Sequence, residues 1–251
     1  MEQLTMRHID SAVELAKIPA MEQAIWGNND PVPTSLLRVF TDFGGEVSVA
    51  YAPERPNRWL GFTMSFGTYD HLGRLLYSHQ TGVLPGFQNQ GVGRFLKYQQ
   101  NRWAEAHGYR RIVWTFDPLR VRNAYFNVAV LGAEITGYYP DYYGVLTSRI
   151  NRGLPTDRLI CEWSVPAPEI PRPDQRIDRK IYLPEDLEQL KSENMQHALR
   201  WRETIKAQFL EALQLGYQVV GFSRPPSPAY LLSKPPQTPS GRNPARYPFR
   251  S

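Results

Sequence analysis

The chain has 251 residues, of which 41% are hydrophobic and 21% are charged, enough for one ordinary domain with an appendage and a packed core. No apolar run approaches the ~18–20 residues that cross a bilayer, and the N-terminal segment lacks the pattern of a signal peptide. The formal net charge is +5, but five basic residues and no acidic ones follow Ser223. Residues 1–223 therefore carry 24 charges of each sign, which argues against a basic nucleic-acid interface on the folded part.

Cysteine usage limits the redox chemistry of the chain. Cys161 is the single cysteine, so an internal disulfide is excluded, and a reducing, cytoplasmic location is expected. Its apolar neighbours Ile160 and Trp163 indicate a strand, and we expect a buried, inert thiol rather than a nucleophile.

The first third of the chain predicts alternating helices and strands. The expected elements are a strand over 3–9, helices over 12–26 and 33–41, and strands over 47–52 and 59–69. Glycine-bearing and polar turns separate them.

The segment from residue 80 to residue 108 is the most informative part of the sequence. A strand over 75–84 meets a glycine-bearing turn that opens into an amphipathic helix, and Gly108 stands where helices commonly end. The expected buried face holds Val92, Phe95, Leu96, Trp103 and Ala106, and Arg94, Lys97 and Arg102 are expected to face away. Because free N–H groups and the helix dipole favour an anion, the turn predicts a site for a group such as pyrophosphate.

The glycine spacing decides between known anion-binding loops. A P-loop needs Lys-Ser/Thr where this chain has Val92-Gly93, and the dinucleotide fingerprint needs a third glycine where it has Leu96. The pattern that fits is Gln88-x-x-Gly91-x-Gly93. Glycines that only shape a turn are the alternative, and the strand before and the helix after favour the functional interpretation.

The elements after this helix also follow a recognisable order. A strand over 111–116 ends at Asp117-Pro118, a short helix runs over 123–132, and strands are expected over 133–139 and 159–165.

In the Gln88–Gly93 signature and in this element order, the chain resembles the GNAT superfamily of acyl-CoA-dependent N-acyltransferases. The segments SHQTGVLP, WTFDPLRVRNAYFN and LGAEITGYYPDYYG look like a poorly characterised bacterial branch of it. The resemblance covers most of residues 1–223. It implies a mixed α/β (α+β) fold whose central sheet is flanked by helices, acetyl-CoA or another acyl-CoA as co-substrate, and transfer of an acetyl or other short acyl group, succinyl included. The expected acceptor is the amine of a small molecule, with amino acids first.

Composition divides the rest of the chain. We expect a GNAT domain over 1–165, a proline-rich linker over 166–175 and a β–α–β subdomain over 176–223. The basic, proline-rich tail over 224–251 has a disordered composition. A single β–α–β unit cannot bury both faces, so it must dock on the main domain or on a partner subunit, which leaves a homodimer open.

The resemblance also assigns candidate cofactor contacts. The pyrophosphate would lie against the turn, and the pantetheine arm would contact the main chain of the preceding strand. The residues assigned to cofactor binding are Thr81, Gly82, Val83, Gln88, Asn89, Gln90, Gly91, Val92, Gly93, Arg94 and Asn123.

The catalytic candidates are fewer. His79 lies two residues before Thr81, on the same strand face if alternation holds, and an imidazole titrates in the useful range for a general base. A histidine hydrogen-bonded within the sheet is the structural alternative, and Asp117 is the rival base. The family's usual tyrosine acid corresponds to Val128, so Tyr143 is the candidate acid, unless the thiolate leaves unprotonated.

Other functions are less well supported. His, Cys and carboxylate residues show no metal-ligand spacing, so no metal is expected, and no serine has a G-x-S-x-G setting. A noncatalytic acyl-CoA-binding or regulatory module is the first alternative, because Val128 departs from the family pattern. A nucleic-acid adaptor working through the basic tail is the second. No membrane partner is expected.

Overall fold

The computed structural model describes residues 3–27, 31–144, 153–168 and 176–234. The chain divides into two compact units. Of the described residues, 3–27, 31–114 and 164–167 form the N-unit, and 115–144, 153–163, 168 and 176–234 form the C-unit. The division lies inside the strand that ends at Phe116. The second half of the expected GNAT domain therefore groups with the C-terminal segment.

A mixed sheet carries the candidate site. Its strands in the N-unit are β1 (Thr5–His8), β2 (Glu46–Tyr51), β3 (Trp59–Asp70), β4 (Gly73–Val83) and β5 (Arg111–Phe116), the last of which continues into the C-unit. β1 to β4 are antiparallel neighbours, and β5 is parallel to β4. With β7 and β6 the hydrogen-bonded order is β1-β2-β3-β4-β5-β7-β6. The fold is therefore mixed α/β, as expected.

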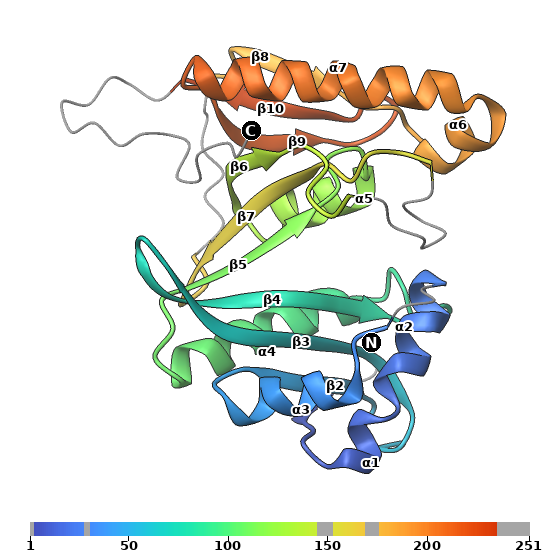
Figure 1. Ribbon diagram of the computed structural model, residues 1–251, viewed down its shortest axis with the longest axis vertical. Coiled ribbons are helices and arrows are strands. Elements are labelled where there is room, and N and C mark those ends of the chain that lie inside the picture. The colour runs from blue at the N-terminus through green and yellow to red at the C-terminus, as the bar shows by residue number, and fades with distance from the viewer. Residues whose placement is uncertain (1–2, 28–30, 145–152, 169–175, 235–251) are drawn as a thin grey trace. The chain divides into compact units, whose positions relative to one another are not determined.

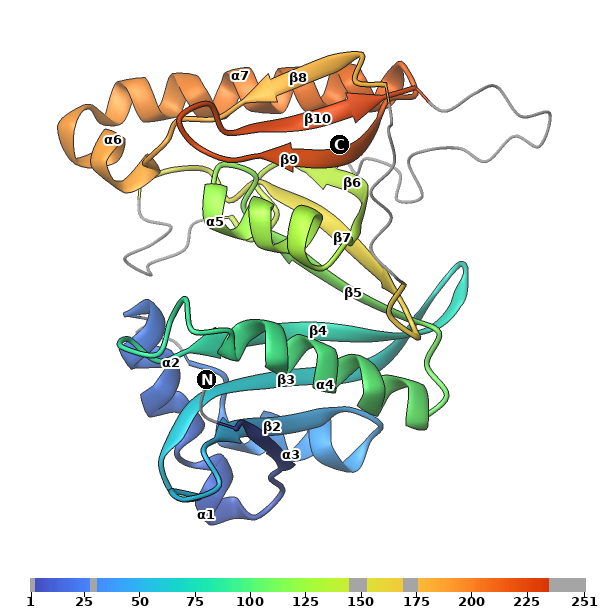
Figure 2. The ribbon, with the colours of Figure 1, turned by 180° about the vertical axis from the view of Figure 1, so that it is seen from behind.

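Helices cover both faces of the N-unit sheet (Figures 1 and 2). α1 (Ala12–Leu15), α2 (Ile18–Trp26) and α3 (Thr34–Asp42) pack on one face, where Leu37, Phe62 and Met64 share a buried cluster. α4 (Val92–Ala106) packs on the other, where Leu60, Val92 and Leu96 are buried together.

The helix expected over 12–26 is wrong in one respect. It is interrupted between α1 and α2, where Pro19 lies in the first turn of α2. Proline is tolerated in a first turn but not inside a helix, which explains the break.

The C-unit contains a strand pair and a second small sheet. β6 (Glu134–Tyr139) and β7 (Arg158–Ser164) are antiparallel, and α5 (Val121–Ala124) runs directly into a π-helical turn, η1 (Tyr125–Val130). β8 (Arg179–Tyr182), β9 (Gln218–Ser223) and β10 (Ala229–Ser233) form a three-stranded sheet in the order β8-β10-β9. It is accompanied by α6 (Leu187–Glu193) and α7 (Met195–Gln214).

The expectation of a disordered tail from residue 224 is wrong for its first part. β10 lies between β8 and β9 and is the central strand of its sheet. Proline-rich composition concealed the strand, because Pro225, Pro226 and Pro228 all fall in the β9–β10 connection. Residues 235–251, and residues 169–175 of the expected linker, lie outside the described part.

The C-terminal segment packs on β6 and on the residues after β5, all within the C-unit. The Phe209 ring on α7 stacks on that of Tyr138 of β6, with centroids 5.6 Å apart. The Tyr230 hydroxyl of β10 donates to the Pro118 carbonyl at 2.8 Å. The appendage is thus an integral part of the C-unit.

Candidate active site

The turn between β4 and α4 presents a helix N-terminus without a side-chain cap. Gly91 precedes the helix in the left-handed region, with φ +85°, and no acidic residue lies in the first turn. The Phe95 amide donates to the Gly91 carbonyl at 2.9 Å. The amides of Val92, Gly93 and Arg94 therefore precede the first intrahelical bond, as in any α-helix. This geometry suits an anion.

The glutamines of the motif hold the turn in place. The Gln88 side chain donates to the Val83 carbonyl at 3.1 Å, and that of Gln90 donates to the Gly86 carbonyl at 2.7 Å. The first bond ties the turn to the end of β4, and the second closes the turn on itself. Gln88 and Gln90 therefore have structural partners, and the anion contacts fall to the backbone.

A β-bulge interrupts β4 beside this turn. Gln80 is opposite Met64 on β3, but Ser78 is opposite Ser65, so His79 is an extra residue on β4. A bulge places two successive residues against one partner and breaks the alternation of faces.

The bulge overturns the expectation that His79 and Thr81 share a face. The His79 ring lies 6.2 Å from that of Phe40 on α3 and 6.4 Å from that of Phe66, centroid to centroid, on the face covered by α1 to α3. Thr81 instead places its hydroxyl 2.9 Å from that of Thr63, on the α4 face. Burial lowers the pKa of His79 and so favours the neutral imidazole, the form that can accept a proton.

The α4 face of β4 holds a buried polar network. The Lys97 ammonium donates to the Ser78 hydroxyl at 3.0 Å and to the Gln100 side-chain carbonyl at 2.7 Å. The Gln100 amide donates to the Thr63 hydroxyl at 2.8 Å. The expectation that Lys97 faces away is therefore wrong: it is only 3% exposed, and its ammonium lies 4.0 Å from the centroid of the Trp114 ring.

The network continues to β2. The Ser48 hydroxyl donates to Glu46 Oε2 at 2.7 Å, whereas Glu46 Oε1 is buried without a hydrogen-bond partner. Burial raises the pKa of Glu46 to about 7, against the opposing effects of Ser48, Gln100 and Lys97. Sequence reasoning missed this network. The one available signal was Gln100, which continues the four-residue spacing of Val92 and Leu96 with a polar side chain.

One edge of β4 loses its partner strand at the same place. The parallel pairs with β5 are Leu76↔Ile112 and Tyr77↔Val113. In the described part of the chain no further β5 partner is recorded for β4, while its other edge stays paired with β3 as far as Val83. Among the described residues, the β4 backbone from Ser78 to Val83 therefore has no strand partner from β5 on that edge.

Gly82 and Val83 have separate roles on this strand. A Cβ on Gly82 would lie 2.8 Å from atoms of Ile25 and Trp26, so glycine is needed where α2 approaches β4. Val83 packs with Leu96 in the cluster under α4.

The remaining candidates lie in the C-unit. Asp117 is buried and receives two hydrogen bonds from the Arg202 guanidinium, at 2.7 and 2.8 Å. Burial would raise its pKa, but the charges of Arg202, Arg158 and Arg120 outweigh that effect and lower the pKa below its usual value. A carboxylate held in this way is a poor base, so the structure favours a structural role for Asp117.

Three further residues of the C-unit were considered at the sequence level. Two of them, Tyr143 and Asn123, are exposed, and Val128 has no reactive group. Tyr143 is 42% exposed, and its hydroxyl lies 3.2 Å from that of Thr115. Asn123 is exposed on α5, and Val128 is buried in the π-helical turn.

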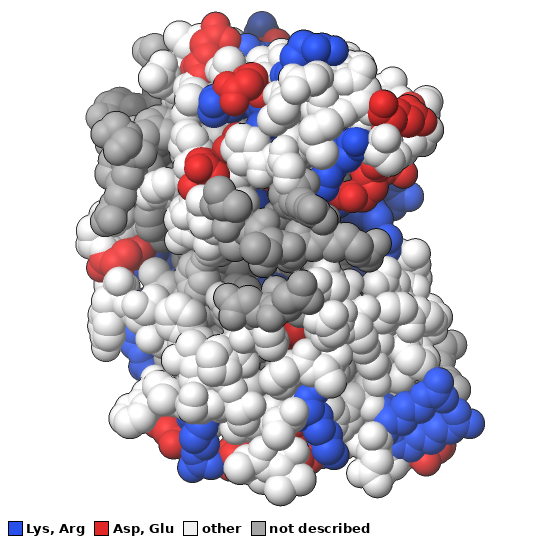
Figure 3. Space-filling view, turned by 45° about the vertical axis from the view of Figure 1, so that its right-hand side comes forward, with Lys and Arg blue, Asp and Glu red and all other residues white. Residues whose placement is uncertain are grey.

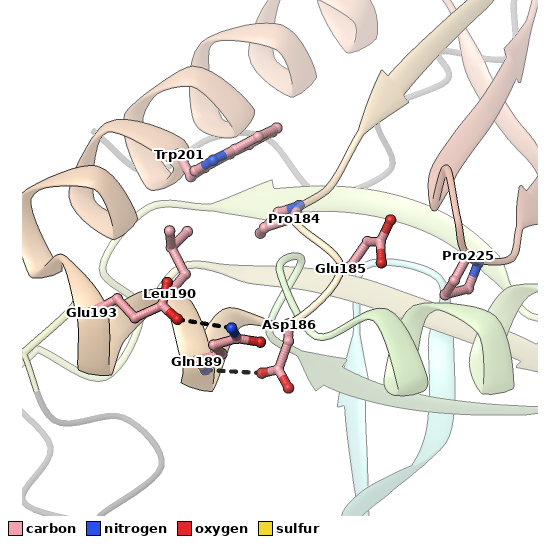
Figure 4. A pocket seen from close by; sticks show the side chains of 8 residues that line it. All are labelled: Pro184, Glu185, Asp186, Gln189, Leu190, Glu193, Trp201 and Pro225. Atoms are coloured by element: carbon pink, nitrogen blue, oxygen red, sulfur yellow. Dashed lines mark hydrogen bonds between the residues drawn. The ribbon is translucent and has the colours of Figure 1, made fainter.

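The molecule also has an open hollow of about 380 Å³ on the C-unit (Figure 4). It is lined by Pro184, Glu185, Asp186, Gln189, Leu190, Glu193, Trp201 and Pro225. Asp186 accepts from the Glu188 and Gln189 amides at the start of α6, so its carboxylate serves as a helix cap. The hollow includes none of the motif residues.

Other classes of site find little support in the described residues. They contain no group of three or more His, Cys, Asp or Glu side chains that could hold a metal ion. None of the described helices combines the length and apolarity required to span a membrane. On the face drawn in Figure 3, side chains of both charge signs lie in small groups. Cys161, the single cysteine of the sequence, is buried.

Comparisons with known proteins identify the fold. Neither a protein-family model nor a curated protein sequence matches the chain. Among solved structures, the chain is similar to the ribosomal-protein-S18-alanine N-acetyltransferase of Escherichia coli, with TM-score 0.51 and 14% identity over 65% of this chain and 94% of that one. It is also similar to a Salmonella typhimurium protein solved with its cofactor acetyl-CoA, with TM-score 0.50 and 17% identity over 70% and 99% of the two chains. An Arabidopsis thaliana protein solved with a bisubstrate analogue gives TM-score 0.51 and 12% identity over 66% and 100%. The chain has the GNAT fold.

Proposed function

We propose that the chain is an acyl-CoA-dependent N-acyltransferase that transfers an acetyl or other short acyl group to the amine of a small molecule in the cytoplasm. The observation that carries the proposal is the uncapped N-terminus of α4, which directly follows a strand with one open edge. The first supplies hydrogen-bond donors for a pyrophosphate, and the second supplies backbone groups for an extended amide-containing arm.

The dimensions of β4 suit the pantetheine arm of CoA. The strand rises about 3.4 Å per residue, so Ser78 to Val83 spans about 17 Å, comparable to an extended pantetheine. With the pyrophosphate at the N-terminus of α4, the thioester falls near the bulge. A backbone N–H of β4 would there stabilise the carbonyl oxygen as it gains charge.

His79 is the proposed general base. Its ring lies on the face opposite Ser78 and Thr81, and burial lowers its pKa, which favours the neutral imidazole. His79→Ala should lower turnover by something like 10²–10⁴-fold and leave acyl-CoA affinity nearly intact. Because burial lowers the pKa of His79, the acidic limb of wild-type turnover should lie at lower pH than the titration of a free imidazole, and the variant should lack that limb.

The structural alternative for His79 gives a different result. If the ring only packs with Phe40 and Phe66, His79→Ala lowers thermal stability, and its turnover loss tracks the unfolded fraction. A stable variant with normal turnover and an unchanged pH profile would remove His79 from the mechanism.

The acceptor is proposed to be a small molecule, with amino acids first. Residues 1–223 carry no net charge, which suits a discrete pocket better than an extended polymer. The Escherichia coli neighbour is described as acting on a ribosomal protein. A panel of free amino acids and peptides tests the point: acylation of peptides alone would contradict it.

A noncatalytic acyl-CoA-binding module is the second candidate. It is favoured by the buried, apolar Val128 at the position of the family's tyrosine acid. Thermal-shift titration with acetyl-CoA and succinyl-CoA, followed by turnover on an amine panel, distinguishes the two. Binding without turnover would support the module, and turnover with either acyl donor would exclude it.

A further inference from the structure

We propose that Ser78, held by Lys97, stabilises the thiolate that departs from acyl-CoA. The inference rests on the proposed function and assigns a leaving-group residue for it. Ser78 would be the catalytic donor that touches the sulfur, and Lys97 would be a positioning residue that acts through it.

Lys97 is an unusual residue for the interior of a helix–sheet interface. It projects from α4 to Ser78 on β4 and lies over the Trp114 ring on β5, at the end of the last pair between these strands. Long charged side chains are rarely fully buried unless they have a specific partner. The ammonium is therefore held at the place where the open edge of β4 begins.

The hydrogen-bond chemistry determines what Ser78 can do. An ammonium group has donors only, so the Ser78 oxygen must accept from Lys97. The hydroxyl then keeps its own proton for donation. The positive charge behind it makes Ser78 a stronger donor and favours a negative partner.

Position along the strand points to the same role. Ser78 is the first β4 residue beyond the pairs with β5, at the far end from the pyrophosphate turn. If the arm follows the open edge, its sulfur ends beside Ser78. Ser78 also faces α4, whereas His79 faces α3, so the donor for sulfur and the base for the amine lie on opposite faces of β4.

The step balances without a further reactant. The amine nitrogen forms a bond to the acyl carbon, and its proton passes to the His79 imidazole. The C–S bond breaks, and its electron pair goes to sulfur as a thiolate that accepts a hydrogen bond from Ser78. Lys97 keeps its proton. The thiolate takes up a proton from water after release, and His79 returns its proton to water.

Val128, at the position that the resemblance assigns to a tyrosine acid, is buried and has no hydrogen-bond donor in its side chain. The other ionisable group beside this network is Glu46, whose pKa is raised by burial against the opposing effects of Ser48, Gln100 and Lys97. Because Glu46 can change its charge near neutral pH, it can contribute to the pH dependence of CoA binding.

The thiol pKa of bound CoA is the direct test. Ultraviolet absorbance of the thiolate is titrated for wild type, Ser78→Ala and Lys97→Met, and affinities for CoA and desulfo-CoA are measured by calorimetry at pH 7 and pH 9. Arg102→Met, which removes an exposed charge from the same helix, is the control. Glu46→Gln shows how much of any pH dependence belongs to Glu46.

We expect the bound wild-type thiol to titrate at least one unit below free CoA, which equals about a tenfold preference for the thiolate. Ser78→Ala and Lys97→Met should return it toward the free value, Lys97→Arg should retain most of the shift, and desulfo-CoA should bind all variants alike. An unshifted wild-type thiol, or a shift that survives in Ser78→Ala, would overturn the proposal. If Lys97→Met does not fold, Ser78→Ala alone decides. Failure of both CoA and desulfo-CoA to bind wild type would instead refute the proposed function.

Discussion

Each unit contains a buried carboxylate, and the two carboxylates differ in how many hydrogen bonds their oxygens accept. In the C-unit, Asp117 accepts from Arg202 through both oxygens and also from the Leu119 amide. In the N-unit, Glu46 accepts from Ser48 through one oxygen, while the other has no partner. The pKa of Asp117 is lowered, and the pKa of Glu46 is raised to about 7.

The different pKa shifts of the two carboxylates suit different roles. Asp117 belongs to a structural ion pair, whereas Glu46 belongs to a network beside the candidate site. Paired and hydrogen-bonded charges hold elements together, and Asp117 joins the end of β5 to α7. An incompletely satisfied group costs stability, and such costs concentrate at functional sites. The N-unit network lies between α4 and the sheet, beside the strand and helix where we propose that CoA binds.

The largest expected effect is on the C-unit pair. Arg202→Met leaves Asp117 buried without its bidentate partner and should destabilise the protein by about 3–5 kcal/mol in urea unfolding. Arg179→Met, which removes a more exposed partner of Glu211, should cost about 1 kcal/mol or less.

The same pair predicts a pH dependence. Because the folded-state pKa of Asp117 is lowered, its contribution is present above the ordinary pKa of 3.8 and is lost as the pH falls below it. The difference in the free energy of unfolding between wild type and Arg202→Met should become smaller as the pH falls below 3.8. A gap that is small at pH 7 would contradict the structural assignment.

The next largest effect is that of Glu46 on stability, and its pH dependence is opposite to that of Asp117. Its folded-state pKa is raised from 4.5 to about 7, so the favourable contribution of the protonated form is present below pH 4.5 and is lost as the pH rises through about 7. At 1.36 kcal/mol per unit this amounts to roughly 3 kcal/mol.

Glu46→Gln removes this titration. The variant should gain stability relative to wild type between pH 5 and pH 8, as measured by urea unfolding at each pH, whereas Glu105→Gln on the exposed part of α4 should not. Parallel stability curves for wild type and Glu46→Gln would show that Glu46 is ionised throughout.

The smallest effect tests how the C-terminal strand is attached. Tyr230→Phe removes the hydrogen bond to the Pro118 carbonyl and keeps the ring against Phe209 and Phe222. We expect a loss of about 1 kcal/mol in urea unfolding. No loss would mean that the carbonyl finds another donor.

Sequence patterns predicted most of the fold, because long periodic segments are strongly constrained. The strand over 111–116 has the predicted bounds, and Gly108 follows α4 with φ +75°. The bulge at His79 could not be predicted, since one extra residue leaves the composition of a strand unchanged. β10 was missed because its flanking prolines outweigh Ala-Tyr-Leu-Leu in any composition window.

The turn before α4 was predicted from the sequence, whereas the buried side-chain network beside it was missed. The turn from Gln88 to Arg94 follows from glycine spacing, which reports conformation directly. The burial of Lys97 depends on Ser78 and Gln100, whose proximity is fixed only when α4 lies on the sheet. Tertiary contacts of this kind leave no periodic signal.

Acyl-CoA affinity at the start of α4 tests the central claim most directly. Calorimetric titration of wild type with acetyl-CoA should show saturable binding, and Gly91→Glu should weaken it at least 100-fold, because a carboxylate and a strained left-handed residue replace the glycine at the anion site. Gly91→Ala measures the strain without the charge, and Gln99→Glu adds the same charge elsewhere on α4. Equal affinity in wild type and Gly91→Glu, or no binding of acetyl-CoA or succinyl-CoA to a folded wild type, would contradict the account.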